Sequence, residues 1–149
     1  KGNATKGLEF YNLLLESDKF TTELGKVNLV AGKLEAEMIL YYSRKGVTKK
    51  LVGLTLGRLI EIGKENNLLD KNQISALKMV CNQRNYFIHN IYSLFTDSID
   101  ETILPKNNLI DTDVITYTDY AWKLKDNLEG LAQIFKERNE PITPVSRNG

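Results

Sequence analysis

Apolar residues recur every three or four positions along most of this chain of 149 residues. That spacing is typical of amphipathic helices, which bury one face against the rest of a domain. It predicts five helices. The first covers about 7–18, the second about 21–44, the fourth about 70–95 and the fifth about 114–138. The third ends near 66, and its start is open between two candidates. No segment alternates convincingly between apolar and polar residues as a half-buried strand would. We therefore expect an all-α fold, a four- to five-helix up-down bundle.

Capping residues predict where several of these helices begin and end. A short polar side chain that accepts a hydrogen bond from the first turn is favoured at a helix start. The candidates are Thr21 or Thr22 for the second helix, Thr48 or Thr55 for the third, and Asp70 with Gln73 in a capping box for the fourth. Gly46 follows the second helix, where a glycine commonly ends one.

The segment over 96–113 differs from the helices because it is acidic and contains Pro105. We expect a connecting loop here, with a short extended pair formed by 102–104 and 109–110. The run Asp111-Thr112-Asp113 resembles a weak metal-binding pair, but a helix N-cap explains it better. Nothing else divides the chain, so we expect one domain over 6–138 with flexible termini at 1–5 and 139–149.

Composition narrows the classes of protein and partner. A net charge of +1 provides no global field, so a nucleic acid would have to be held by a local basic patch. The single cysteine, Cys81, excludes an internal disulfide, favours a reducing compartment and has no neighbouring histidine for zinc. No apolar run approaches the roughly twenty residues that span a bilayer. We expect a cytoplasmic protein with no membrane partner, cofactor or metal.

The only histidine, His89, lies in the run QRNYFIHNIY over 83–92. At about 100° per residue, Asn85 and His89 share one face of a helix and Tyr92 extends it, whereas Arg84 lies about 140° from His89. The other residues of this run are largely apolar. The helix therefore carries a polar notch, which suits a site at the edge of the core or at a subunit interface.

The run Arg84-Asn85-Tyr86-Phe87-Ile88-His89 resembles the Arg-x4-His motif of the HEPN superfamily. The resemblance implies a small all-α bundle, and many members of that family are metal-independent endoribonucleases of toxin–antitoxin, antiphage and RNA-processing systems, usually dimeric. It implies Arg84 and His89 as catalytic residues, RNA as substrate and an antitoxin or other protein as a partner. Other members keep the fold without catalysis, so the alternative is an inactive HEPN-like module that binds a protein or RNA.

The residue types agree with cleavage of RNA by its own 2′-hydroxyl. Imidazole can accept and donate protons near neutral pH, and a guanidinium fork suits two phosphoryl oxygens. Asn85 can hydrogen-bond the imidazole or a phosphate. One chain supplies one histidine, whereas the reaction needs both a base and an acid, so we expect a homodimer that joins two Arg84–His89 pairs. The aromatic and aliphatic side chains around the notch also indicate an interface.

The segment over 44–50 contains four basic side chains and no acidic one. Arg44, Lys45, Lys49 and Lys50 could follow an RNA backbone. The alternative, which we favour, is that they solubilise a helix end whose dipole attracts cations. These four residues and Tyr92 are candidate RNA contacts.

Overall fold

A computed structural model describes residues 2–96 and 104–140, and it confirms the all-α helical bundle. Two strands of two residues each accompany the helices in this part of the chain. In chain order the elements are β1 (Ala4–Thr5), α1 (Leu8–Glu16), α2 (Asp18–Arg44), α3 (Leu56–Glu65), α4 (Lys71–Asn85), the π turn η1 (Tyr86–Asn90), α5 (Ile91–Phe95), β2 (Leu109–Ile110) and α6 (Asp113–Asn139).

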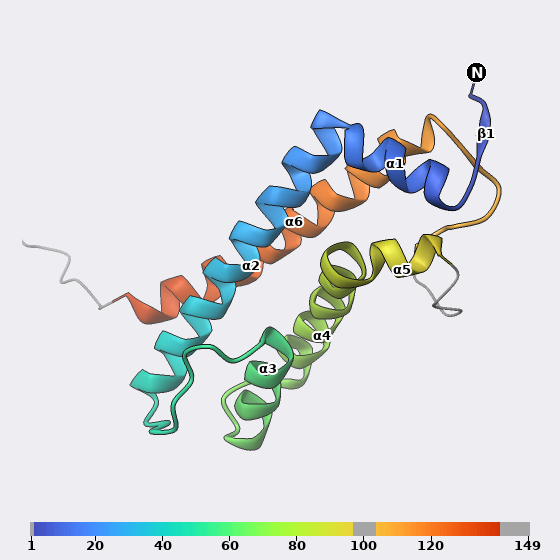
Figure 1. Ribbon diagram of the computed structural model, residues 1–149. Coiled ribbons are helices and arrows are strands. Elements are labelled where there is room, and N and C mark those ends of the chain that lie inside the picture. The colour runs from blue at the N-terminus through green and yellow to red at the C-terminus, as the bar shows by residue number, and fades with distance from the viewer. Residues whose placement is uncertain (1, 97–103, 141–149) are drawn as a thin grey trace, which may run out of the picture.

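The two longest helices, α2 and α6, lie side by side and run in the same direction (Figure 1). Lys33 of α2 pairs with Glu129 of α6 at 2.8 Å. Near the end of both helices, the side-chain amide of Asn139 donates 2.9 Å hydrogen bonds to the backbone and side chain of Glu37. The longest pair of the bundle is thus parallel, and α3, α4 and α5 lie between the two helices in the chain.

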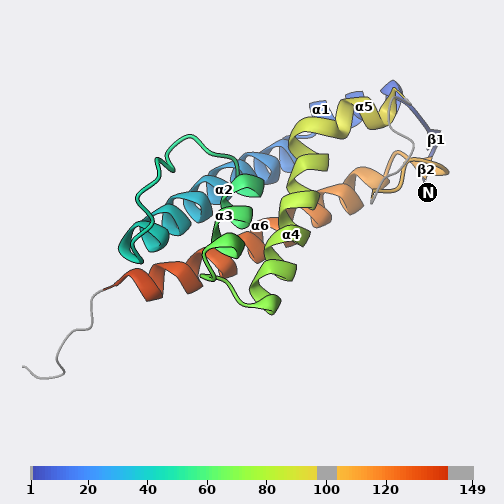
Figure 2. The ribbon, with the colours of Figure 1, turned by 90° about the horizontal axis from the view of Figure 1, so that it is seen from below.

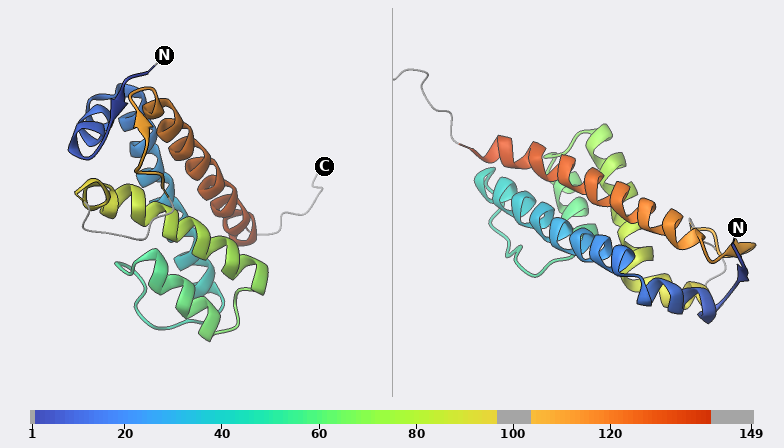
Figure 3. Two further views of the ribbon diagram at one scale, coloured as in Figure 1. Left: turned by 90° about the vertical axis from the view of Figure 1, so that its right-hand side faces the viewer. Right: turned by 90° about the horizontal axis from the view of Figure 1, so that it is seen from above.

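The remaining helices cover one side and one end of the α2–α6 pair. α3 and α4 pack against each other and cross this pair, and α1 packs against α5 (Figures 2 and 3). The core between these layers is apolar, and its largest fully buried side chains are Tyr42, Tyr117, Phe10, Phe135, Leu14, Leu34, Met38, Leu56, Leu59, Ile60, Ile62 and Leu77. This packing fixes α3 and α4 relative to each other.

Most of the predicted helix ends are confirmed. Asp70 and Gln73 form the capping box through hydrogen bonds of 2.9 and 2.8 Å. Thr55, the second of the two candidates, caps α3 by accepting a 3.2 Å hydrogen bond from the amide of Arg58. Gly46, at a φ of 96°, follows the end of α2 as expected.

The predicted cap of the second helix was wrong. Ser17 caps α2, because its hydroxyl accepts a 3.1 Å hydrogen bond from the amide of Phe20. Thr21 lies inside the first turn and donates instead to the carbonyl of Ser17 at 2.9 Å. The helix therefore begins four residues before Thr21, at the earlier polar residue Ser17.

The predicted extended pair was half right. Residues 109–110 form a strand, which pairs antiparallel with Ala4–Thr5. Residues 102 and 103 lie outside the described part of the chain, and Leu104 is not in a strand. Part of the N-terminal segment that we expected to be flexible is therefore paired. Asp111 ties it further by accepting a 3.1 Å hydrogen bond from the amide of Asn3.

The C-terminal boundary also needs correction. Asn139, expected in a flexible tail, is the last residue of α6 and is buried against α2. The expected N-cap lies within the run 111–113, because Thr112 is the N-cap residue of α6, although its side chain forms no capping hydrogen bond. The Asp113 carboxylate instead accepts a 2.8 Å hydrogen bond from the amide of Ile110. Residues 141–149 lie outside the described part of the chain.

The fourth predicted helix, over 70–95, is interrupted where the sequence motif lies. Regular helix ends at Asn85, η1 covers the next five residues, and α5 continues at a different angle (Figures 1 and 2). A π turn is a recognised cause of helix kinks. The bend lets α5 bury Leu94 and Phe95, and Phe95 stacks on Phe10 of α1 at 5.3 Å between ring centres. We call α4, η1 and α5 together the motif helix.

Candidate functional site

The π turn changes how the motif's side chains are arranged around the helix axis. Hydrogen bonds that span five residues hold more residues in each turn, so each residue advances by less than the roughly 100° of an α-helix. The offset between Arg84 and His89 is therefore smaller than the about 140° that an unbroken helix would impose. Such π turns are frequent at functional sites.

A pocket of about 330 Å³ opens beside the π turn. Arg84, Asn85 and His89, the three predicted catalytic residues, all line it. The rest of the wall consists of Cys81 and Asn90 from the motif helix and of Thr55 and Gly57 from the start of α3. The structure thus brings the three candidate residues together around one space, which we call the motif pocket.

Arg84 lines the motif pocket as a partly buried cation without an ion pair. Its Nε is buried and has no hydrogen-bond partner among the described residues. None of the ion pairs in the described part of the chain includes Arg84. Because guanidinium forms its strongest contacts with carboxylate and phosphate oxygens, an anion would satisfy both the charge and the unpaired donor.

The start of α3 adds a second group that favours anions. The amides of Arg58 and Leu59 are already used, since Thr55 accepts from both through its hydroxyl and its carbonyl. The first two amides of the helix, those of Leu56 and Gly57, have no acceptor within it. A helix N-terminus attracts negative charge. Arg84 and this end of α3 therefore meet at the same pocket.

His89 is exposed at the edge of the motif pocket. We expected Asn85 to orient the imidazole or to bind a phosphate. No hydrogen bond joins Asn85 to His89 in the part of the chain that the structure covers. The imidazole can therefore reach a ligand in the pocket, and the amide of Asn85 is also available to that ligand.

Cys81 lies in the wall between Arg84 and α3. Burial raises the pKa of its thiol, the Arg84 guanidinium lowers it, and the Glu35 carboxylate on α2 raises it. A thiol whose pKa is raised is mostly neutral near pH 7, so it is a poor nucleophile. We assign Cys81 to the wall of the pocket and to no chemical step.

The other predicted RNA contacts do not line the motif pocket. Tyr92 lies on α5, past the bend, where its exposed ring packs edge-on against Tyr11 with ring centres 5.0 Å apart. The expectation that Tyr92 extends the face of His89 assumed an unbroken α-helix, whereas η1 lies between α4 and α5 in the structure.

Arg44, Lys45, Lys49 and Lys50 are all exposed. Arg44 and Lys45 lie at the C-terminal end of α2, which is far from η1 in the bundle (Figure 1). There Lys45 and Arg138 both approach the ring of Tyr41, at 5.6 and 5.7 Å from its centre. Lys49 and Lys50 belong to the loop that leads from this end to Thr55.

The apolar side chains around the polar notch are buried within a single chain to a greater extent than we expected. Phe87 is buried, and Tyr86, Ile88 and Ile91 are half-buried against the core of the same chain. A single chain therefore covers most of this cluster. The remaining reason to expect a dimer is chemical, namely the need for a second proton-transfer group.

Sequence reasoning missed four residues of the motif pocket as parts of a site: Thr55, Gly57, Cys81 and Asn90. Thr55 was identified only as a helix cap, and Cys81 was considered only for a disulfide or zinc and excluded from both. Their shared role depends on α3 crossing the motif helix, a long-range contact that no local pattern encodes. Asn90 lines the pocket as part of the π turn, which the apolar spacing did not reveal.

Within residues 2–96 and 104–140, no group of three or more His, Cys, Asp or Glu side chains has the arrangement of a metal site. None of the helices described is long and apolar enough to cross a membrane.

Comparisons with models of protein families, with curated proteins and with solved structures give no match to this chain.

Proposed function

We propose that this chain is a HEPN-like endoribonuclease that cleaves RNA without a metal ion. The observation that carries the proposal is the convergence of Arg84, Asn85 and His89 on one pocket at a π turn. A packing role would not require an exposed imidazole beside a guanidinium whose Nε is buried and unpaired. The Arg84 guanidinium and the start of α3 suit a phosphodiester.

In the proposed reaction the 2′-oxygen of a ribose attacks the adjacent phosphorus. The 2′-hydroxyl proton goes to an imidazole, the bond to the 5′-oxygen breaks, and that oxygen receives a proton. The products are a 2′,3′-cyclic phosphate on one fragment and a 5′-hydroxyl on the other. Arg84 binds the phosphoryl oxygens and stabilises the charge that grows on them in the transition state. Asn85 positions the phosphate or the imidazole.

One His89 cannot act as base and acid in the same step. We therefore propose that two chains form a dimer about a two-fold axis and place two Arg84–His89 pairs in a composite active site. Light scattering at micromolar concentration measures the molecular mass and so tests the dimer independently of cleavage. A clean monomer of about 17.0 kDa that still cleaves RNA would contradict the composite site.

A toxin or antiphage role in the cytoplasm, opposed by an antitoxin, belongs to the same proposal and rests on the motif resemblance. The second candidate is a catalytically silent HEPN-like module that binds RNA or a protein partner. The exposed His89 favours the first candidate, because proton transfer requires an imidazole that can reach the bound ligand.

The deciding experiment compares purified wild type with His89→Ala, Arg84→Ala and Arg84→Lys on total cellular RNA. His89→Ala should reduce the cleavage rate by about two to four orders of magnitude. Arg84→Ala should lose a comparable amount, and Arg84→Lys should recover part of it because lysine lacks the fork. Arg58→Ala is the matched control, since Arg58 is exposed and pairs only loosely with Glu65 at 3.8 Å.

Two further measurements complete this experiment. The products should carry 2′,3′-cyclic phosphate, and EDTA should not reduce the rate. Wild-type protein that cuts no RNA, together with a large fall in melting temperature for His89→Ala, would favour the silent module. Cleavage that EDTA abolishes and magnesium restores would contradict the metal-independent mechanism.

A further inference from the structure

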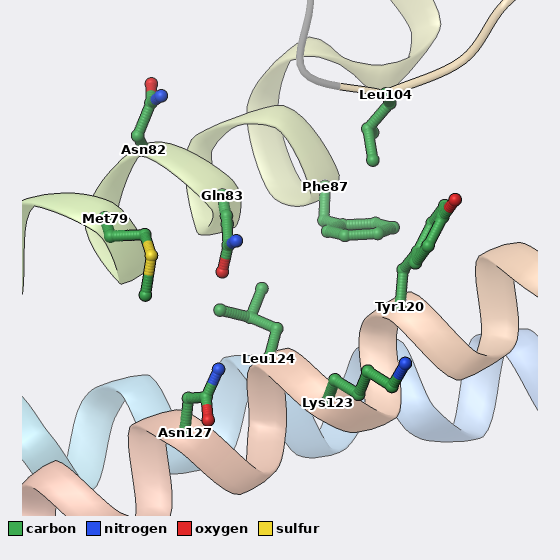
Figure 4. Close-up of a pocket in the computed structure, with 9 residues that line it drawn as sticks. All are labelled: Met79, Asn82, Gln83, Phe87, Leu104, Tyr120, Lys123, Leu124 and Asn127. Atoms are coloured by element: carbon green, nitrogen blue, oxygen red, sulfur yellow. The ribbon is translucent and has the colours of Figure 1, made fainter. Parts of the chain in front are cut away.

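The pockets along α6 differ in the charges that line them. One lies between α4 and α6, and Lys123 is the only charged side chain in its lining (Figure 4). Another, of about 550 Å³, lies where α2 and α6 both begin, and its lining contains Lys19, Glu23 and Asp119. Its volume is within the range of about 300–1,000 Å³ that small-molecule sites occupy. We call this second space the α2–α6 pocket.

One wall of the α2–α6 pocket is an apolar face of α6. Val114, Ile115 and Trp122 line it. Ile115 and Trp122 are about two helical turns apart and so share one face, and their side chains are 72% and 46% exposed. The indole of Trp122 also attracts cations, since the Nζ atom of Lys125 lies 5.2 Å from the ring centre. A ligand that covers this wall would remove exposed apolar surface from water.

The α2 side of the pocket holds a carboxylate with an unpaired oxygen. The Oε1 atom of Glu23 is buried and has no hydrogen-bond partner among the described residues. Its Oε2 atom pairs with the exposed Lys26 at 3.4 Å. A buried oxygen without a donor costs free energy, and an ammonium group supplies three donors. On the facing helix Asp119 adds a second carboxylate, whose pair with Lys123 is exposed and therefore weak.

The same pocket also contains groups that favour a negative charge. Lys19 is exposed about one turn before Glu23 on α2, and it forms no ion pair with any described residue. Ser17 also lines the pocket. Its hydroxyl oxygen accepts from the amide of Phe20, so the hydroxyl hydrogen is left to donate. A carboxylate can accept from both the ammonium of Lys19 and this hydroxyl.

We propose that the α2–α6 pocket binds a free amino acid with an apolar side chain. The ammonium group of the ligand pairs with Glu23 and Asp119. Its carboxylate pairs with Lys19 and Ser17, and its side chain covers Trp122. Hydrogen bonds between charged groups are about twice as strong as those between neutral ones. A ligand with a single charge would leave either Glu23 or Lys19 unpaired, so the distribution of charge favours a zwitterion.

Trp122, the only tryptophan of the chain, reports directly on this pocket. The experiment titrates the full chain with phenylalanine and follows the intrinsic fluorescence of Trp122. Two analogues each lack one charged group: phenethylamine has no carboxylate, and 3-phenylpropionate has no amine. Both should bind about tenfold more weakly than phenylalanine, because each loses one set of charge-assisted hydrogen bonds. Glycine should bind more weakly still, because it has no side chain to cover the indole.

Two variants of similar shape separate the two charged groups. Glu23→Gln should weaken the binding of phenylalanine and phenethylamine about tenfold and leave that of 3-phenylpropionate unchanged. Lys19→Gln should weaken phenylalanine and 3-phenylpropionate and leave phenethylamine unchanged. Glu137→Gln is the control, because Glu137 is exposed near the other end of α6 and accepts a 3.3 Å hydrogen bond from Gln133. Thermal melting should show that all three variants fold like wild type.

The pattern across probes and variants decides the proposal. Support requires that phenylalanine bind and that each variant weaken only the probes that carry the matching charge. No change in fluorescence with millimolar phenylalanine, equal binding of phenylalanine and either analogue, or variants that bind like wild type would overturn it. Because the readout is the fluorescence of Trp122 and involves no RNA, the result is independent of the proposed cleavage.

Discussion

The hydroxyl of Tyr42 on α2 donates a 2.8 Å hydrogen bond to the carbonyl oxygen of Leu59 on α3. Both residues are fully buried. The bond joins α3, a helix of ten residues, to α2. It therefore helps to hold Thr55 and Gly57 at the wall of the motif pocket.

Tyr42→Phe should lower the free energy of unfolding by about 1–3 kcal/mol, because it leaves a buried carbonyl without this donor. Denaturant unfolding followed by circular dichroism measures the change. Tyr92→Phe, on an exposed ring of α5, is a comparison variant for the loss of an exposed hydroxyl. A Tyr42→Phe variant as stable as wild type would mean that the bond contributes little to holding α3.

Alkaline pH should destabilise the fold through the same residue. Burial raises the pKa of Tyr42, with a smaller contribution from Tyr41, and burial likewise raises the pKa of Tyr117. In the unfolded chain these phenols ionise near pH 10. The stabilisation is thus complete below about pH 10 and decreases as the pH rises toward the higher pKa of the folded state. Unfolding midpoints at pH 8 and 11 should differ less in Tyr42→Phe than in wild type.

Gly63 allows α3 to pack closely against α2. A Cβ at this position would lie 2.6 Å from a side-chain carbon of Leu69 and would also overlap the Tyr42 hydroxyl. Gly63→Ala should therefore destabilise the protein by about 1–3 kcal/mol, as overpacked cores do. Gly32→Ala is the control, because Gly32 lies in α2 with nothing near its Cβ position. The control should be neutral or stabilising by about 0.5–1 kcal/mol.

The Cys81 thiol offers a direct test of the charges at the motif pocket. Arg84→Ala should raise the pKa of Cys81, and Glu35→Gln should lower it, because the guanidinium favours the thiolate and the carboxylate opposes it. The rate of alkylation by iodoacetamide as a function of pH measures both shifts. Shifts in the same direction would mean that Arg84 or Glu35 does not lie as the structure describes.

The helices could be predicted from the sequence because their signals are local. Apolar spacing located α2 and α6, and the pair Asp70 and Gln73 located the start of α4. The sequence also identified Arg84, Asn85 and His89 as one polar notch. These features depend on residues within a few turns of one another, which is the range over which periodicity and capping act.

The rest of the site depends on contacts between distant segments. The pairing of 109–110 with 4–5 brings together residues more than a hundred positions apart. The π turn arises where one helix must bury Phe87 in the main core and Phe95 against α1. The start of α3 reaches the motif pocket only through packing of the whole bundle. These three features are determined by tertiary packing, which overrides local helix propensity.

The parallel pairing of α2 with α6 has a consequence for synthesis on the ribosome. The side chains that join them, such as Lys33 with Glu129 and Glu37 with Asn139, are 96 and 102 residues apart. At about 5–20 residues per second, the ribosome needs roughly 5–20 s to move from the end of α2 to the end of α6. Through that interval the apolar stripe of α2 lacks its main partner. The nascent chain should therefore depend on chaperones until its last helix emerges.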